Sequence, residues 1–319
     1  MTRTLVCIAV VAAALFATPA AQSADWPAKP IRIVVPFAAG GAADVWARVI
    51  AEHLSVALKQ SVVVENRGGS GGMIAATQVA RAEPDGYTLL IGGLAPQILA
   101  PAVARNADFD VVRDFTPIAY IGGPPLAWVV SPSSELRSVA DLIAAAKADK
   151  LSGYASSGVG TVGHLVVELV ARQNGLKLTH IPYNTAAFAD IIAGRVPMGS
   201  FTWGAALGQL QGGTLRALAV TTEARRPEVP SVPTFKELGY DLVASTWFTL
   251  TGPKGLPSEI TQRLNREVIA IMDRPEIRQR LAQDAFEPKP LTPDQLSALM
   301  ASELARWTPV AQAAAAKTQ

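Results

Sequence analysis

Residues 31–44 read IRIVVPFAAGGAAD, and this stretch decides the fold. Its first five residues form a short β-branched run, which is typical of a strand buried on both faces of a parallel sheet. A turn of small residues follows, and residues 44–58 then carry apolar side chains along one helical face. Strand, glycine-rich turn and helix in this order predict the opening of a parallel α/β sheet.

The same order recurs along the chain. The pattern predicts strands at residues 62–64, 87–91, 128–130, 154–155, 178–181 and 215–220, and helices ending near 81 and at 139–147, 162–175, 258–273, 275–282 and 292–307. Segments 119–125 and 242–246 are the expected crossings between domains. The prediction is therefore two α/β domains, each a mostly parallel sheet flanked by helices. Residues 25–125 with 246–319 form the first, and residues 126–245 form a second, inserted one.

Residues 1–24 have the pattern of a secretory signal peptide. Arg3 precedes an apolar run at residues 5–17, and small residues follow with expected cleavage after Ala20, Ala21 or Ala24. The run is shorter than the roughly 20 residues that a membrane span needs. The one cysteine, Cys7, lies inside this run, so the exported chain is expected to contain no disulfide, thiolate metal site or cysteine nucleophile. The predicted location is the periplasm.

Composition narrows the class of protein. The chain has 319 residues, enough for two domains, with 50% hydrophobic and 17% charged residues. Twenty-eight basic residues against 26 acidic ones give a net charge of +2, and no basic run forms a patch. This balance argues against a nucleic-acid partner.

Catalytic motifs are absent from the sequence. The three histidines show no metal-ligand spacing, and neither a Gly-x-Ser-x-Gly elbow nor a glycosidase carboxylate pair occurs. We therefore expect no enzyme activity, no metal and no cofactor. His53 is expected on the surface, whereas His164 lies one turn into a helix and is a candidate to approach a ligand.

Three small-residue turns, at 37–44, 68–72 and 156–161, connect a predicted strand to a predicted helix. Glycine permits close backbone approach, and the free amides and dipole of a helix N-terminus favour a carboxylate. The alternative is that such turns only make tight connections. Asp44 can bind the first-turn amides or a donor on the ligand, and Trp203 and Trp247 can pack in the core or line a cleft.

Several ordered motifs resemble one protein family. They are PFxxGGxxDxxxR at 36–48, ENRxGxGG at 65–72, PDGYTL at 84–89, YxSxGxGTxxHL at 154–165, PY at 182–183 and VPTxxExG at 232–239. Together they resemble the extracytoplasmic solute receptors of tripartite tricarboxylate transporters, the Bug family. The resemblance covers nearly the whole exported chain.

This resemblance implies a type II-like periplasmic binding protein, or Venus flytrap, whose two domains close on a ligand. The implied ligand is a small mono- or dicarboxylate, held by loops 37–44 and 156–161 largely through backbone amides and ordered water. The implied partners are membrane transporter subunits, and the chain is expected to be a monomer. Two other functions stay open: a sensory co-receptor for a membrane signalling protein, and a periplasmic hydrolase that uses His164.

The residues expected to bind the ligand lie in the two loops and at the far end of the cleft. They are Phe37, Ala38, Gly40, Gly41, Asp44, Ser156, Ser157, Gly160, Thr161, His164, Tyr183, Thr185, Thr202 and Trp203. Asn184-Thr185 stands where the family usually has Lys-Gly, and residues 199–203 replace a segment that often carries an Asp. The far end is thus expected to determine which acid is bound.

Overall fold

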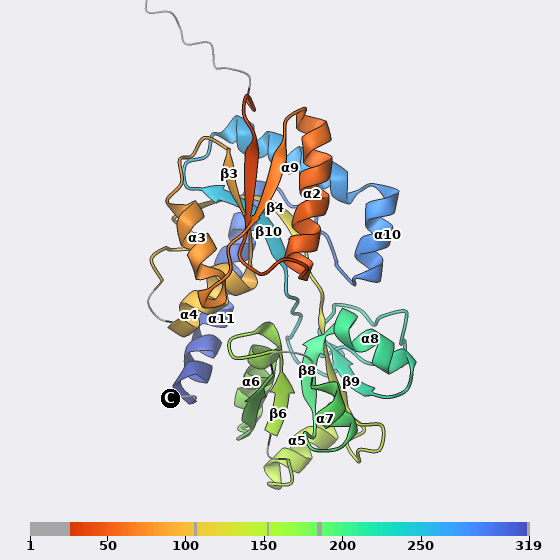
Figure 1. The fold of residues 1–319 in the computed structure, drawn as a ribbon. Coiled ribbons are helices and arrows are strands. Elements are labelled where there is room, and N and C mark those ends of the chain that lie inside the picture. Colours follow the sequence, from red (N-terminus) through yellow and green to blue (C-terminus); the bar gives the residue numbers. More distant parts are fainter. Residues whose placement is uncertain (1–25, 105–106, 152, 184–186, 318–319) are drawn as a thin grey trace, which may run out of the picture.

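The computed structural model describes residues 26–104, 107–151, 153–183 and 187–317. It contains two lobes, each built on a five-stranded sheet (Figure 1). The sheet of the first lobe has the order β2-β1-β3-β10-β4, and that of the second lobe β7-β6-β8-β5-β9. Their bounds are β1 Ile31–Val35, β2 Val62–Asn66, β3 Thr88–Gly93, β4 Phe115–Gly122, β5 Leu126–Val130, β6 Gly153–Ser156, β7 Thr179–Pro182, β8 Gly199–Thr202, β9 Arg216–Val220 and β10 Phe248–Pro253.

Each sheet is mostly parallel with one reversed strand. In the first lobe β1 is parallel to β2 and β3, whereas β10 is antiparallel to both β3 and β4. In the second lobe β6 is parallel to β7 and β8, whereas β5 is antiparallel to β8 and β9. The predicted fold class is confirmed. The two sheets correspond strand by strand, so that β1 and β6 hold the same position.

Helices flank both sheets (Figure 1). They are α2 Ala42–Leu58, α3 Met73–Ala80, α4 Ala100–Ala104, α5 Val139–Lys147, α6 Val162–Asn174, α7 Phe188–Ile192, α8 Trp203–Gln211, α9 Ser258–Met272, α10 Pro275–Gln283 and α11 Pro293–Lys317, with single turns η2 Ser70–Gly72 and η3 Ala95–Leu99. In the described part of the chain, none of them has the length and apolar character needed to cross a membrane.

The chain passes from the first sheet to the second between Gly122 and Leu126, and it re-enters the first sheet at Phe248. A bridge pairs Pro125 with Ser245, so the outgoing and returning segments lie side by side. This pair of segments is the hinge region between the lobes.

Helix α11 contacts both lobes. It packs on β4 and α4 of the first lobe and on α6 of the second. One buried cluster joins Ile98 of the first lobe, Val170 of the second, and Trp307 and Val310 of α11. The predicted helix end near residue 307 is wrong by ten residues, because the helix continues through Pro309 to bury this second contact.

Candidate functional site

The β1–α2 loop (residues 36–41) follows the carboxyl end of the first central strand. Gly40 has φ +84°, a left-handed conformation that disfavours any side chain. Gly41 is the N-cap of α2, and no side chain caps that helix. Since the first-turn amides of a helix have no partner within the helix, they are available to solvent or to an anion.

Asp44 holds this loop from beneath. Its carboxylate is 3% exposed and accepts hydrogen bonds from Gly40 N at 2.9 Å, Asn66 Nδ2 at 2.9 Å and Arg48 Nε at 3.1 Å. Asn66 Nδ2 also donates to the Phe37 carbonyl at 3.1 Å. The hydrogen bond from Arg48, together with those from Gly40 and Asn66, outweighs burial and lowers the Asp44 pKa to about 2. Asp44 therefore acts as an internal acceptor that fixes the loop.

The β6–α6 loop (residues 156–161) repeats this construction in the second lobe. Gly160 has φ +74°, and its amide donates to His164 Nδ1 at 3.0 Å. Thr161 caps α6 by accepting the amide of His164 at 3.3 Å. In each lobe a left-handed glycine thus donates its amide to the side chain four residues later, Asp44 in one and His164 in the other. The equivalent positions of β1 and β6 explain this correspondence.

Ser156 organises the start of the same loop. Its side chain is fully buried, and Oγ lies 2.7 Å from His180 Nε2 and 3.2 Å from the Gly158 amide. It also donates to the Gly158 carbonyl at 3.1 Å. A serine beside a histidine is the geometry of a nucleophile and its base. Here, however, the hydroxyl is enclosed by its own loop, so the pair is arranged to hold backbone rather than to attack a substrate.

The glycine-rich turn at residues 68–72 differs from the other two. A Cβ atom on Gly71 would lie 2.8 Å from the Ala100 Cβ, and one on Gly72 would lie 2.7 Å from the Pro96 Cβ and 2.9 Å from the Pro36 Cβ. Close packing against η3 and α4 therefore requires these glycines. For this turn, the tight-connection interpretation accounts for the composition.

The remaining predicted residues lie at the edge or in the core of the second lobe. Tyr183 is half-buried, and its hydroxyl donates to Asp190 Oδ2 at 2.6 Å. Thr202 is the N-cap of α8 without a side-chain bond. The ring of Trp203 is fully buried, and its amide donates to the Pro125 carbonyl at 2.8 Å. Thr185 lies outside the described residues.

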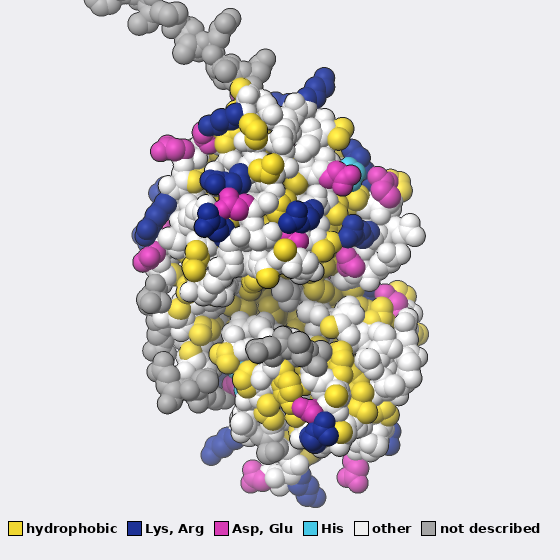
Figure 2. Space-filling view, in the orientation of Figure 1, with side chains coloured by type: hydrophobic (Ala, Val, Ile, Leu, Met, Phe, Trp, Pro, Cys, Tyr) yellow, Lys and Arg dark blue, Asp and Glu magenta, His cyan; other side chains and the backbone are white. Residues whose placement is uncertain are grey.

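The two loops face each other across the gap between the lobes (Figure 1). Figure 2 shows that the surface is hollowed there. Ala38 and Ser157 are exposed at the loop tips. A Cβ on Gly160 would lie 3.4 Å from Val103 Cγ2 of α4, so the lobes nearly touch beside the hollow. We take this hollow as the candidate site.

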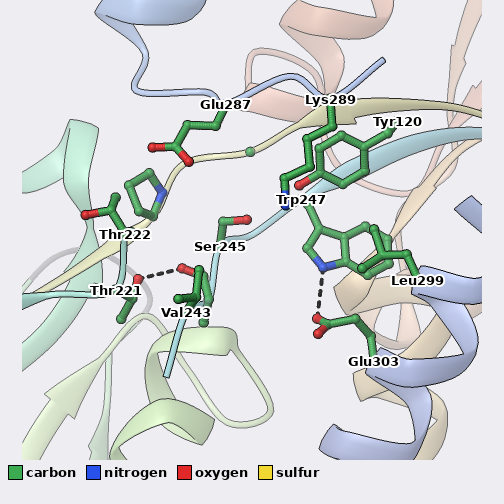
Figure 3. A pocket seen from close by; sticks show the side chains of 13 residues that line it. Tyr120, Thr221, Thr222, Val243, Ser245, Trp247, Glu287, Lys289, Leu299 and Glu303 are labelled. Carbon is green, nitrogen blue, oxygen red and sulfur yellow. Dashed lines mark hydrogen bonds between the residues drawn. The ribbon is translucent and has the colours of Figure 1, made fainter. Parts of the chain in front are cut away.

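A small pocket lies at the hinge rather than between the loops (Figure 3). It encloses about 80 Å³ and is lined by Tyr120, Ser245, Trp247, Glu287 and Glu303, among others. Burial raises the pKa of Tyr120. Glu303 Oε2 accepts from both Trp247 Nε1 and Trp307 Nε1 at 3.1 Å. Trp247, a candidate cleft residue, thus belongs to the packing of the hinge.

Replacing Glu303 by leucine is expected to lower the melting temperature. Two largely buried indole N–H groups lose their acceptor, at a cost of about 3 kcal/mol in the free energy of unfolding. For a chain of this size that corresponds to a decrease of roughly 5 °C. Glu303→Gln keeps an acceptor oxygen and is the control. Differential scanning calorimetry measures the melting temperatures of both variants. Equal values would contradict the role of Glu303 as a stabilising acceptor for the two indoles.

Sequence reasoning missed Arg48, Asn66 and His180 as parts of the site. Arg48 and Asn66 stand in the quoted motifs, but nothing in the sequence shows that both bond to Asp44. His180 comes from a separate strand. Within the described ranges, no group of three or more His, Cys, Asp or Glu residues is placed to hold a metal ion.

Comparison with known proteins agrees with this geometry. Residues 46–315 match the model of the tripartite tricarboxylate transporter family receptor, TctC. The chain is 37% identical to the protein BugT of Bordetella pertussis over 324 residues, covering 99% of each. The structure of R. palustris Rpa4515 with adipate is 36% identical, with a TM-score of 0.77 over 91% of this chain and 98% of that one. MatC from Rhodopseudomonas palustris with bound malate is 29% identical, with a TM-score of 0.75 over 90% and 100% of the two chains.

Proposed function

This chain belongs to the tripartite tricarboxylate transporter receptor family, and from that premise we propose that it captures a small carboxylated organic acid for a membrane transporter. The family consists of solute receptors rather than enzymes. The observation that carries the proposal is the matched pair of loops, one in each lobe. Both place a left-handed glycine next to a helix N-terminus, and both face the hollow.

Backbone amides supply the grip on the ligand in this proposal. One carboxylate lies against the residues Phe37, Ala38, Gly40 and Gly41, and the β6–α6 loop approaches it through Ser157, Gly160 and Thr161. The amides of Gly40 and Gly160 are themselves bonded to Asp44 and His164, so these two glycines contribute close approach of the backbone rather than a donor. The helix dipoles of α2 and α6 favour a negative charge at this point. We propose that Tyr183 and Thr202 line the far end, and that these residues, with Thr185, distinguish one acid from another. The solved relatives with adipate and with malate support a dicarboxylate ligand.

We propose that the ligand closes the lobes. A carboxylate that touches both loops has a higher affinity for the closed state and therefore shifts the population towards it. We also propose that residues 1–24 direct export to the periplasm, that residues 25–125 with 246–319 and residues 126–245 move as the two bodies, and that the receptor is a monomer. The signal segment lies outside the described residues.

A thermal-shift screen of the purified exported chain, after unfolding and refolding to remove any ligand carried through purification, tests the function. Adipate, malate and a set of monocarboxylates are the probes, and neutral sugars and amines are the controls. A ligand at 100 times its Kd stabilises the folded state by about 2.7 kcal/mol, so the melting temperature of a binder rises with concentration. Mass spectrometry should recover the acid unchanged. A chemically altered acid, or no shift with any carboxylate, would refute the receptor function.

A further inference from the structure

Two imidazole rings lie stacked beneath the β6–α6 loop. The ring centroids of His164 and His180 are 4.0 Å apart, and their planes differ by 12°. His164 is 2% exposed and His180 is half-buried. Each ring holds a different end of the loop, since His180 bonds to Ser156 and His164 to Gly160.

The bond to Gly160 requires a particular protonation state. The amide of Gly160 is a donor, so His164 Nδ1 must be an acceptor and carry no proton. A protonated imidazole carries a proton on both nitrogens, and it would then face one donor with another. Between Ser156 Oγ and His180 Nε2 either atom can be the donor, since the tautomer of His180 sets the direction of that bond. The structure fixes the acceptor role of His164, so protonation of this ring is what would break the bond that holds Gly160.

Tyr154, Glu168 and Arg172 are the titratable groups nearest the pair. On β6, the ring of Tyr154 stacks 5.1 Å from that of His180, and its hydroxyl donates to Glu168 Oε1 at 2.9 Å. Glu168, on α6, is 6% exposed and shares a pocket with Arg172 of the same helix and with the apolar residues Val310 and Ala313 of α11.

Burial lowers the pKa of His180, and the charge of Glu168 opposes this only in part. His180 therefore becomes charged only at a pH below its ordinary value of about 6.5, and the neutral stack is lost as the pH falls. Two charged rings at this separation would also repel each other.

We propose that His164 and His180 are positioning residues for the β6–α6 loop, and that protonation of His164 releases this half of the carboxylate grip. The affinity part of the inference rests on the function proposed above, whereas the loop part does not. In the first lobe Asp44 has the same structural role and stays ionised throughout the range in which histidines titrate. The β1–α2 loop is therefore held in the same way across this pH range, whereas the hydrogen bond that holds the β6–α6 loop depends on pH.

The variant His164→Asn separates positioning from titration. An asparagine oxygen can accept the Gly160 amide much as Asp44 accepts that of Gly40, but it does not titrate. We expect the Gly160 amide resonance of 15N-labelled protein to move between pH 7.5 and 5.5 in the natural chain and to move much less in this variant, where only His180 still titrates. His53→Asn is the control. His53 lies on α2 with Nδ1 3.0 Å from Arg274 Nη1, and its replacement should preserve the natural response.

Calorimetric titration with adipate and malate gives the second measurement. Between pH 7.5 and 5.5, the natural chain should lose about tenfold more affinity than His164→Asn, the equivalent of one hydrogen bond. The titration of the acid itself is common to both proteins and cancels. The variant should bind more weakly at pH 7.5, since asparagine is shorter. Equal pH ratios, or a stationary Gly160 resonance in the natural chain, overturn the inference. If neither acid binds at either pH, the proposed function fails and the resonance alone decides the positioning role.

Discussion

Replacing Gly40 by valine is expected to weaken dicarboxylate binding by at least about a hundredfold, or ~2.7 kcal/mol. At φ +84°, a β-branched residue is strained, and the loop must shift to relieve it. That shift breaks the bond from Gly40 to Asp44, and with it the arrangement of the amides at the start of α2. The new side chain would also point into open space, since no atom lies within 4 Å of a Cβ on Gly40.

Gly255→Val is the matched control for this substitution. Gly255 has φ +80° and equally open surroundings, but it lies in the turn before α9. Both variants have similar backbone strain, so their circular dichroism should agree, whereas Gly40→Val should melt at a somewhat lower temperature because it also loses the bond to Asp44. Calorimetric titration with adipate and malate then compares affinity alone. If Gly40→Val binds as tightly as Gly255→Val, the β1–α2 loop does not hold the ligand.

Replacing Asp44 by alanine is expected to destabilise the fold by about 3 kcal/mol and to reduce ligand affinity. The change removes the acceptor of the Gly40 amide and of Arg48 Nε, leaves Asn66 Nδ2 with the Phe37 carbonyl as its acceptor, and empties a position where Asp44 was 3% exposed. Asp273→Ala is the control, because it breaks an exposed pair with Arg278 at 2.7 Å, and such pairs contribute less than about 1 kcal/mol. Urea unfolding measures both variants. If both variants lose a similar amount of free energy of unfolding, the hydrogen bonds around Asp44 contribute no more to stability than an exposed ion pair does.

The same network predicts a dependence on pH. The folded pKa of Asp44 is about 2, below its ordinary value of 3.8, so its ionised form stabilises the folded state at every pH above 3.8. This contribution decreases as the pH falls from 3.8 towards 2. Arg48 is partly exposed, and solvent screens its interaction with Asp44. The contribution of the ionised Asp44 to the free energy of unfolding is therefore about 1–2 kcal/mol. The difference in stability between the natural chain and Asp44→Ala should therefore narrow over that interval.

Local sequence patterns predicted some helices and strands correctly and missed others. Helix α5 has the predicted bounds because Ser138 caps it, accepting the Asp141 amide at 3.0 Å. Strand β10 was not predicted, since its pattern of Thr, Gly and Pro is weak and it pairs with strands far away in the sequence. For the same reason, residues 119–122 were assigned to a crossing although they end β4. Strand pairing between segments far apart in the sequence cannot be predicted from the pattern of residues within one segment.

Glycine placement located both loops of the candidate site, because a left-handed turn needs glycine whatever surrounds it. The roles of individual side chains were harder to predict. Asp44 was predicted to bind either the first-turn amides or a donor on the ligand, and His164 was a candidate to approach the ligand. In the structure both are nearly buried and accept a backbone amide. The sequence shows that a polar residue follows the turn, but only the packed structure shows which way it faces. His180 joins the site through strand pairing, which spacing within one segment does not reveal.

The reach of helix α11 determines where the two ends of the chain lie. Residue 26 is in the first lobe, whereas the last turns of α11 lie against α6 of the second (Figure 1). The one cysteine of the sequence is Cys7, ahead of the described residues. Cysteines introduced at the exposed positions Ala28, in the first lobe, and Ala148, in the second, would be the only thiols of a chain that lacks residues 1–24. A donor and acceptor dye on this pair would place one label on each lobe, and the receptor would become an optical sensor without any fused protein.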